Sequence, residues 1–267
     1  MRLVITKNVG KWAATYVREQ LKKANPTADK NFVLGLPTGG TAVDLYKNLV
    51  KFYNNKEVSF KNITSFNMDE YIGLPENHPE SYHTFMFEHL FNHVDMDKSK
   101  INIPNGNADD IKKFCADYEE KIKSVGGVDL FIGGVGENGH IAFNEPFSSL
   151  ASHTRDKELK QNTIEANARF FGGDVNLVPK KAITVGIQTL LDSREVLIMM
   201  SGERKALALH HCLEGAISHV WPVSILQMHQ KALIVVDEEA ASEIKVKTYR
   251  YFKDFEDEYS YIEDLAK

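Results

Sequence analysis

Two acidic residues and a histidine, in two short segments, are the side chains best suited to acid–base chemistry. Asp69 and Glu70 stand side by side, shortly after an apolar run that ends at Phe66. Neighbouring residues of an extended segment point to opposite sides, so only one of the two carboxylates can face a given pocket. Such a pair is more typical of loop surface than of a catalytic site. Asp69 is therefore a candidate base only if other residues support it.

That support comes from the glycine-rich segment 133–146, which holds His140 and, five positions later, Glu145. Glycines let the backbone bend closely around a ligand. A histidine changes charge near neutral pH, and a nearby carboxylate can fix its tautomer and stabilise its protonated form. Taken alone, His140 could equally be a packed histidine beside a turn. Four glycines in the same segment favour the ligand site.

A second glycine-rich turn, residues 37–41, joins an apolar run to a helical pattern. Backbone N–H groups at such a helix start bind phosphate well. The turn lacks the lysine of a Walker loop and the spacing of a dinucleotide fingerprint, and an ordinary tight turn is an equal alternative. Isolated basic residues elsewhere are usually solvated and gain a role only if a phosphate binds. The candidates for that binding are Gly39, Gly40 and Thr41 of the turn, with Arg169 and Lys205.

Histidine pairs raise the alternative of a metal site. His89 and His93 are four residues apart in a helical pattern, and His210 and His211 are neighbours. Neither pair has a recognisable third ligand, and ten histidines produce such pairs by chance. We predict no metal.

Apolar runs and helical patterns alternate along the chain. The runs predict strands at Leu3–Thr6, Phe32–Leu36, Ile63–Phe66, Leu130–Gly133, Ala182–Val185, Val196–Met200 and Ala232–Val236. Helices are predicted at Lys11–Ala24, Thr41–Phe52, Glu80–Leu90, Asp109–Lys123, Glu203–Leu213 and Glu238–Glu258. This alternation predicts an α/β fold with a single open, mostly parallel sheet and helices on both faces. Ligands bind beyond the carboxyl ends of such strands.

We predict one domain over residues 1–267, in which residues 144–180 form either a mobile lid or an irregular excursion. No run of about 18 apolar residues and no signal-like start is present, so we expect a cytoplasmic protein without a membrane partner. A net charge of −5 with dispersed lysines and arginines argues against a nucleic-acid partner.

Several of these segments, in the same order, resemble the glucosamine-6-phosphate deaminase family nearly end to end. They are LGLPTGGT at 34–41, FNMDEY at 66–71, GGVGENGHIAFNEP at 133–146, RFF at 169–171, TVG at 184–186 and KALAL at 205–209. The resemblance implies an enzyme of amino-sugar metabolism that converts glucosamine 6-phosphate and water to fructose 6-phosphate and ammonia. It also implies a modified Rossmann fold and no cofactor. Relatives are often homohexamers, though some are monomers.

The resemblance also implies a role for each matching residue. Asp69 falls on the general base that moves a proton from C2 to C1 of the open-chain sugar. His140 falls on the residue that opens the sugar ring, and Glu145 on the acid that assists it. The five phosphate candidates named above fall on the phosphate pocket of the family.

The chain departs from the family pattern at two positions. Many relatives have aspartate at the position of Asn138, a change that affects how His140 is held. Some hexameric relatives also have an allosteric pocket for N-acetylglucosamine 6-phosphate. The matching residues here are Ser148, Arg155 and Lys157, followed by Glu158 where threonine is common. Because a carboxylate at 158 would compete with the phosphate, we expect weak activation or none.

Two alternatives fit part of the pattern. A 6-phosphogluconolactonase has a related fold and a similar glycine-rich segment, but it lacks the FNEP continuation found here at 143–146. A sugar-phosphate sensor of a transcription regulator would need a helix-turn-helix module, and the chain begins directly with a predicted strand. Asp69, His140 and Glu145 also favour catalysis over a sensor.

Overall fold

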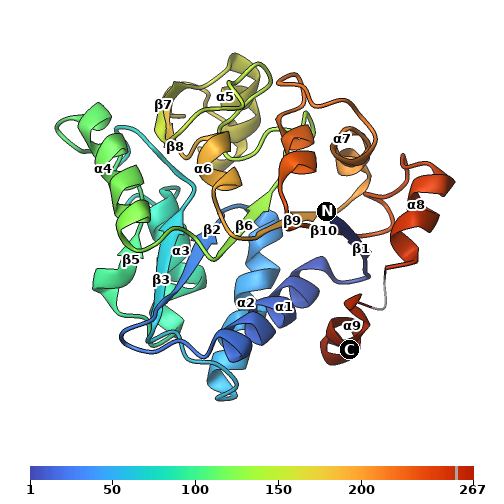
Figure 1. Cartoon of the computed structure of the whole chain (residues 1–267). Helices are drawn as coiled ribbons and strands as arrows, with labels where there is room; N and C mark the ends of the chain where they lie inside the picture. The colour runs from blue at the N-terminus through green and yellow to red at the C-terminus, as the bar shows by residue number, and fades with distance from the viewer. Residues whose placement is uncertain (256–257) are drawn as a thin grey trace.

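A seven-stranded sheet forms the centre of the molecule (Figure 1), in a computed structural model that describes residues 1–255 and 258–267. The strand order is β1 (Arg2–Ile5), β10 (Ala232–Val236), β9 (Val196–Met200), β6 (Leu130–Gly134), β2 (Phe32–Leu36), β3 (Ile63–Asn67) and β5 (Ile101–Asn102). Every neighbouring pair is parallel. The predicted open, mostly parallel sheet is confirmed.

Helices cover both faces of this sheet, because its strands alternate apolar side chains between two cores. Leu34 of β2 packs in one core with Trp12 and Leu45, from the helices drawn below the sheet in Figure 1. Val33 packs in the other core with Leu190 and Leu209, from helices drawn above it. The α-helices are α1 (Val9–Ala24), α2 (Gly40–Asn54), α3 (Tyr82–His89), α4 (Ile111–Ser124), α5 (Gln161–Asn167), α6 (Ile187–Leu191), α7 (Ala206–Leu213), α8 (Val246–Lys253) and α9 (Ser260–Ala266).

A second, antiparallel sheet consists of β4 (Asp69–Tyr71), β8 (Lys181–Thr184) and β7 (Arg155–Glu158). It corrects one prediction, because the run at 182–185 contributes to this sheet and not to the parallel one. With α5, the small sheet caps the carboxyl ends of the long strands at the top of Figure 1. Residues 144–180 supply β7 and α5, and their mobility as a lid stays a prediction.

The predicted helix over 238–258 is wrong. Residues 238–243 form turns, and Val246–Lys253 is the only α-helix within the described part of that range, which leaves out 256–257. The Asp237 carboxylate accepts hydrogen bonds from the backbone N–H groups of Ala240 (2.8 Å) and Gly202 (2.9 Å) and so holds the turn. None of the helices described here is long and apolar enough to span a membrane.

Gly35 shows how tightly the central strands pack. A Cβ atom at this position would lie 2.3 Å from Cδ1 of Phe131, the neighbouring residue on β6. We therefore expect Gly35→Ala to lower the free energy of unfolding by about 1–3 kcal/mol through overpacking. Gly134→Ala is the matched control, because a Cβ there meets no atom within 4 Å. Equal denaturation midpoints for the two variants would contradict this packing.

Candidate active site

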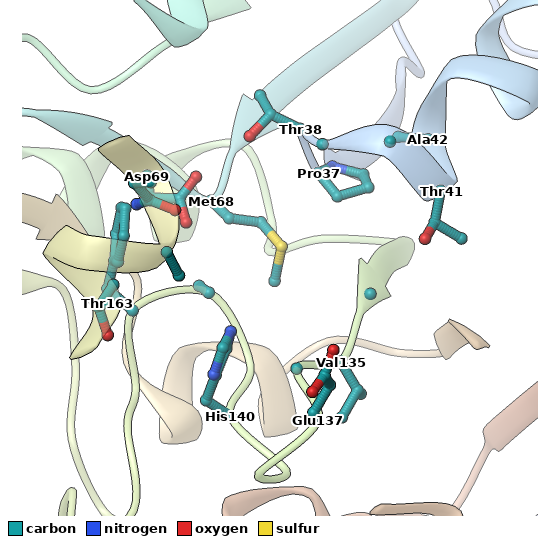
Figure 2. A pocket seen from close by; sticks show the side chains of 18 of the residues that line it. Pro37, Thr38, Thr41, Ala42, Met68, Asp69, Val135, Glu137, His140 and Thr163 are labelled. Carbon is teal, nitrogen blue, oxygen red and sulfur yellow. The ribbon is translucent and has the colours of Figure 1, made fainter. Parts of the chain in front are cut away.

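A cavity of about 690 Å³ opens at the carboxyl ends of the central strands. Its wall combines the turn after β2, the start of β4, the glycine-rich segment after β6 and residues after β9. The structure brings to this one cavity all of the predicted catalytic and phosphate-binding residues, which are Gly39, Gly40, Thr41, Asp69, Asn138, His140, Glu145, Arg169 and Lys205. Figure 2 shows Asp69 on one side of the cavity and His140 on another.

The adjacent carboxylates of Asp69 and Glu70 have different surroundings, one in the cavity and the other against the start of α3. Glu70 accepts hydrogen bonds from the backbone N–H groups of Tyr71 (2.8 Å), Tyr82 (3.1 Å) and His83 (2.8 Å). Two of these groups belong to the first turn of α3, so Glu70 anchors that helix. Asp69 lines the cavity instead. The expectation that only one of the two faces the pocket is confirmed.

Asp69 is a buried carboxyl, with 7% of the residue exposed. No residue in the described ranges donates a hydrogen bond to its side chain, in contrast to Glu70. Burial, and secondarily the negative charge of Glu70, raise the pKa of Asp69 to about 8. A carboxyl group with this pKa is matched to accepting a proton near neutral pH.

His140, Asn138 and Glu145 form a hydrogen-bonded relay. His140 Nδ1 lies 2.7 Å from Asn138 Oδ1, and Asn138 Nδ2 lies 3.0 Å from Glu145 Oε2. A carboxylate only accepts, so it orients the amide with its nitrogen toward Glu145 and its oxygen toward the ring. The amide oxygen in turn requires a proton on Nδ1. Neutral His140 therefore keeps its lone pair on Nε2.

The His140 ring is 34% exposed in a polar cavity. Burial is the main cause that lowers the pKa of His140, with Lys205 acting in the same direction and Glu145 and Glu137 acting against it. The neutral tautomer just described is thus the prevailing form at neutral pH. It can accept one proton at Nε2 and pass it on.

Glycines place the ring. A Cβ atom at Gly136 would lie 2.1 Å from His140 Cε1, so the ring packs directly against that backbone. Gly139 has φ 78°, and a Cβ there would meet the Trp221 ring at 2.8 Å. The glycine-rich segment is therefore required for the close approach of His140 and for the turn before it.

The opposite end of the cavity suits a phosphate. Helix α2 begins at Gly40 after Gly39, which has φ 96° and no side chain, so the first backbone N–H groups have no side-chain cap. These groups and the helix dipole favour an anion. Arg169 and Lys205 line the same cavity. Burial first, and then Arg169 and Arg204, lower the pKa of Lys205, while Glu137 acts in the opposite direction.

Among the lining residues that sequence reasoning missed, three have polar contacts within the wall. Arg204 and Glu137 lie opposite each other, with Arg204 Nη1 3.7 Å from Glu137 Oε1. Their only sequence signal is proximity to Lys205 and His140. Thr163, from α5, donates a hydrogen bond to Glu145 Oε1 at 2.5 Å. Nothing in the sequence links positions 163 and 145.

The residues matched to an allosteric pocket lie outside the cavity wall. Ser148 is buried, and Arg155 donates to Asn144 Oδ1 at 2.8 Å. Arg155 and Lys157 share the partly buried face of β7, while Glu158 lies on its exposed face. The Glu158 side chain is 82% exposed and approaches Lys181 Nζ at 3.6 Å. The expected competition of Glu158 for Arg155 and Lys157 is therefore not present in this structure.

Comparison with known proteins agrees with the site. Residues 6–235 match the family described as glucosamine-6-phosphate isomerases/6-phosphogluconolactonase. The chain is 58% identical to a glucosamine-6-phosphate deaminase of Yersinia enterocolitica, over 97% of this chain and 98% of that protein. It is 54% identical to one of Borreliella burgdorferi, over 96% of this chain and 97% of that protein.

Solved structures agree with this grouping. A monomeric glucosamine-6-phosphate deaminase is 40% identical, with a TM-score of 0.85 over 91% of this chain and all of that one. A 6-phosphogluconolactonase of Thermotoga maritima is 19% identical, with a TM-score of 0.68 over 88% of this chain and 97% of that one, and it shows the fold alone. The chain, with its buried Asp69 facing the His140 relay, belongs to the glucosamine-6-phosphate deaminase family.

Proposed function

We propose that this protein converts glucosamine 6-phosphate and water to fructose 6-phosphate and ammonia. The observation that carries the proposal is the placement of a buried, unpaired Asp69 carboxyl in the same cavity as the His140 relay and a cationic helix N-terminus. Such a cavity holds a base, a proton shuttle and an anion site together, which an aldose–ketose isomerisation of a phosphorylated sugar requires. Membership of the deaminase family supports the same reaction.

Ring opening falls to His140. Neutral His140 accepts the proton of the anomeric hydroxyl at Nε2 and returns it to the ring oxygen, which releases the open-chain aldehyde. Asn138 holds the Nδ1–H during both steps, and the Glu145 carboxylate holds Asn138. The positive charge that forms briefly on the imidazole is stabilised by Glu145, whose Oε2 lies 3.7 Å from Nδ1.

Isomerisation falls to Asp69. Its carboxylate takes the proton from C2 while the aldehyde oxygen O1 takes up a proton from solvent, which gives an enolamine. Return of the C2 proton to C1 then gives an iminium at C2. Water then adds to C2 and releases one proton to solvent, and the carbinolamine so formed loses ammonia and leaves a ketone. A proton held on a buried carboxyl exchanges slowly with solvent compared with one on an exposed group, which favours transfer between the two carbons.

The phosphate supplies binding energy far from the reacting carbons and orients them. Its oxygens accept hydrogen bonds from the α2 N-terminal amides and from Thr41, with charge balanced by Arg169 and Lys205. The partial positive charge of the helix end and the basic side chains favour a phosphorylated sugar over an uncharged one.

A direct assay tests the function. Purified protein without added metal should release equal amounts of ammonia and fructose 6-phosphate from glucosamine 6-phosphate. The same preparation should leave 6-phosphogluconolactone at its spontaneous hydrolysis rate. Lactone hydrolysis without ammonia release would replace the proposal with the lactonase alternative.

The proposal also covers the oligomeric state of the protein and its cellular compartment. We infer a cytoplasmic homo-oligomer, with a hexamer as the specific expectation, although the solved deaminase at 40% identity is described as monomeric. Exposed apolar side chains such as Phe147 (69%) and Ile217 (42%) support association. Light scattering during size-exclusion chromatography distinguishes a 30.2 kDa monomer from an oligomer.

Asp69→Asn should lower kcat about 10²- to 10⁴-fold, because an amide cannot accept the C2 proton. It should also stabilise the protein. The unfolded chain releases this proton near pH 3.8 and the folded chain near pH 8, so the natural protein loses stability as the pH rises between these values. The stability gain of the variant should grow across that window in denaturation experiments.

Glu70→Gln is the matched control for that variant. Both Glu70 oxygens accept backbone hydrogen bonds, and a glutamine would turn an NH₂ group toward one of the donors. This variant should lose stability where Asp69→Asn gains it. Half of the natural turnover in Asp69→Asn, or a stability difference that does not change with pH, would remove Asp69 from its role.

Lys205→Ala should raise KM about 10- to 100-fold with a smaller change in kcat, because a charge-assisted contact to phosphate is present in ground and transition states alike. Arg169→Ala should behave similarly. Lys112→Ala, at an exposed position on α4, should leave KM unchanged. Equal turnover of unphosphorylated glucosamine by the natural protein would contradict the phosphate site.

Asn138→Asp should move the acid limb of the kcat/KM profile to higher pH. An added carboxylate beside Nδ1 stabilises imidazolium, so neutral His140 appears only at higher pH. The same change places two carboxylates about 3.0 Å apart, at the present Asn138 to Glu145 contact, and should therefore also lower stability at alkaline pH. Superimposable pH profiles would show that position 138 is not coupled to the limiting step.

A further inference from the structure

We propose that Thr163 is a positioning residue that sets the tautomer of His140 through Glu145 and Asn138. The reaction it serves rests on the proposed function. Thr163 lies on α5, in a different segment from the other three residues, and it borders the cavity in Figure 2. Its hydroxyl is the contact through which α5 reaches the relay.

The two oxygens of Glu145 have separate donors. Thr163 Oγ1 donates to Oε1 at 2.5 Å, and Asn138 Nδ2 donates to Oε2 at 3.0 Å. Glu145 is buried, with 6% exposure, so water does not readily replace a lost donor. The hydroxyl therefore fixes the rotation of the carboxylate and keeps Oε2 directed at Asn138.

The orientation of Asn138 follows from that of Glu145. An amide can turn over and exchange its oxygen for its nitrogen with little change in shape. Two contacts distinguish the orientations here: the acceptor at Glu145 Oε2, 3.0 Å from Asn138 Nδ2, and the backbone N–H of His140, which donates a long hydrogen bond of 3.3 Å to Asn138 Oδ1. The contact to Glu145 is the shorter and involves a charged group, so we expect it to dominate. In the turned orientation the NH₂ group would face His140 Nδ1, which would then have to be the acceptor, and the proton would move to Nε2.

That exchange would disable ring opening. His140 must present a lone pair at Nε2 to take the anomeric proton, and the Nε2–H tautomer has none. Loss of the Thr163 hydroxyl should thus lower kcat more than it changes KM, because no contact in the phosphate end of the cavity is altered. A role limited to packing would instead change stability and leave the tautomer alone.

The test is Thr163→Val, which keeps the shape of the side chain and removes the hydroxyl. Nitrogen-15 NMR of histidine-labelled protein, without substrate, should show His140 as the Nδ1–H tautomer in the natural chain and a substantial Nε2–H fraction in the variant. The kcat should fall about tenfold, as expected for one hydrogen bond to a charged group, with KM within about twofold of the natural value. Thr163→Ser, which retains the hydroxyl, should restore both the tautomer and the rate.

Thr189→Val is the matched control. Thr189 is a buried threonine whose hydroxyl donates to a glutamate, Glu119 Oε1, at 2.6 Å, outside the cavity wall. Its loss should lower stability without moving the His140 spectrum. If Thr163→Val does not fold, Thr163→Ala serves for the same spectrum.

Two results would overturn the proposal. One is an unchanged His140 tautomer in the variant that lacks the hydroxyl. The other is a Thr163→Ser protein as impaired as Thr163→Val. Because the spectrum is recorded without substrate, failure of the proposed reaction would appear as absent turnover in the natural protein and leave the tautomer result intact.

Discussion

The constraint on which this site depends is the burial of one carboxyl group, Asp69, to which no residue of 1–255 or 258–267 donates a hydrogen bond. Asp69 lies on a three-residue strand that leaves the long sheet and pairs with β8. The neighbouring carboxylate, Glu70, is fully engaged with the start of α3 and holds this strand in place. Glu70 therefore has a structural role, and the adjacent Asp69 carboxyl is left to face the cavity with a raised pKa.

On the other side of the cavity, the His140 side chain is held by a chain of hydrogen bonds. There the polar side-chain atoms from the Thr163 hydroxyl to His140 Nδ1 are hydrogen-bonded to one another, and these bonds fix which nitrogen of His140 carries the proton. The buried Asp69 carboxyl and the hydrogen-bonded His140 ring can share one cavity because separate elements hold them. β4 carries Asp69, and the segment after β6 carries His140. Helix α5 contributes Thr163, which is hydrogen-bonded to Glu145.

Apolar periodicity predicted most of the parallel sheet, and the glycine-rich turns together with the family resemblance predicted nine of the residues that line the cavity. They failed where the signal is not local. β7 has the sequence RDKE, with no apolar residue to mark a strand, and it forms only because β8 pairs with it. The turns after β10 depend on Asp237, and the side of β7 on which Glu158 lies depends on strand register. Thr163 could not be found because its partner is 18 residues away along the chain.

The most direct measurement of the central claim is the titration of the Asp69 carboxyl in the substrate-free protein. Carbon-13 NMR of labelled aspartate side chains, with Asp69→Asn to identify the signal, gives its midpoint. The buried, unpaired carboxyl described here should titrate with a pKa of about 8. A midpoint near 3.8, the ordinary value for aspartate, would show a solvated carboxylate and contradict the account of Asp69 as a poised base.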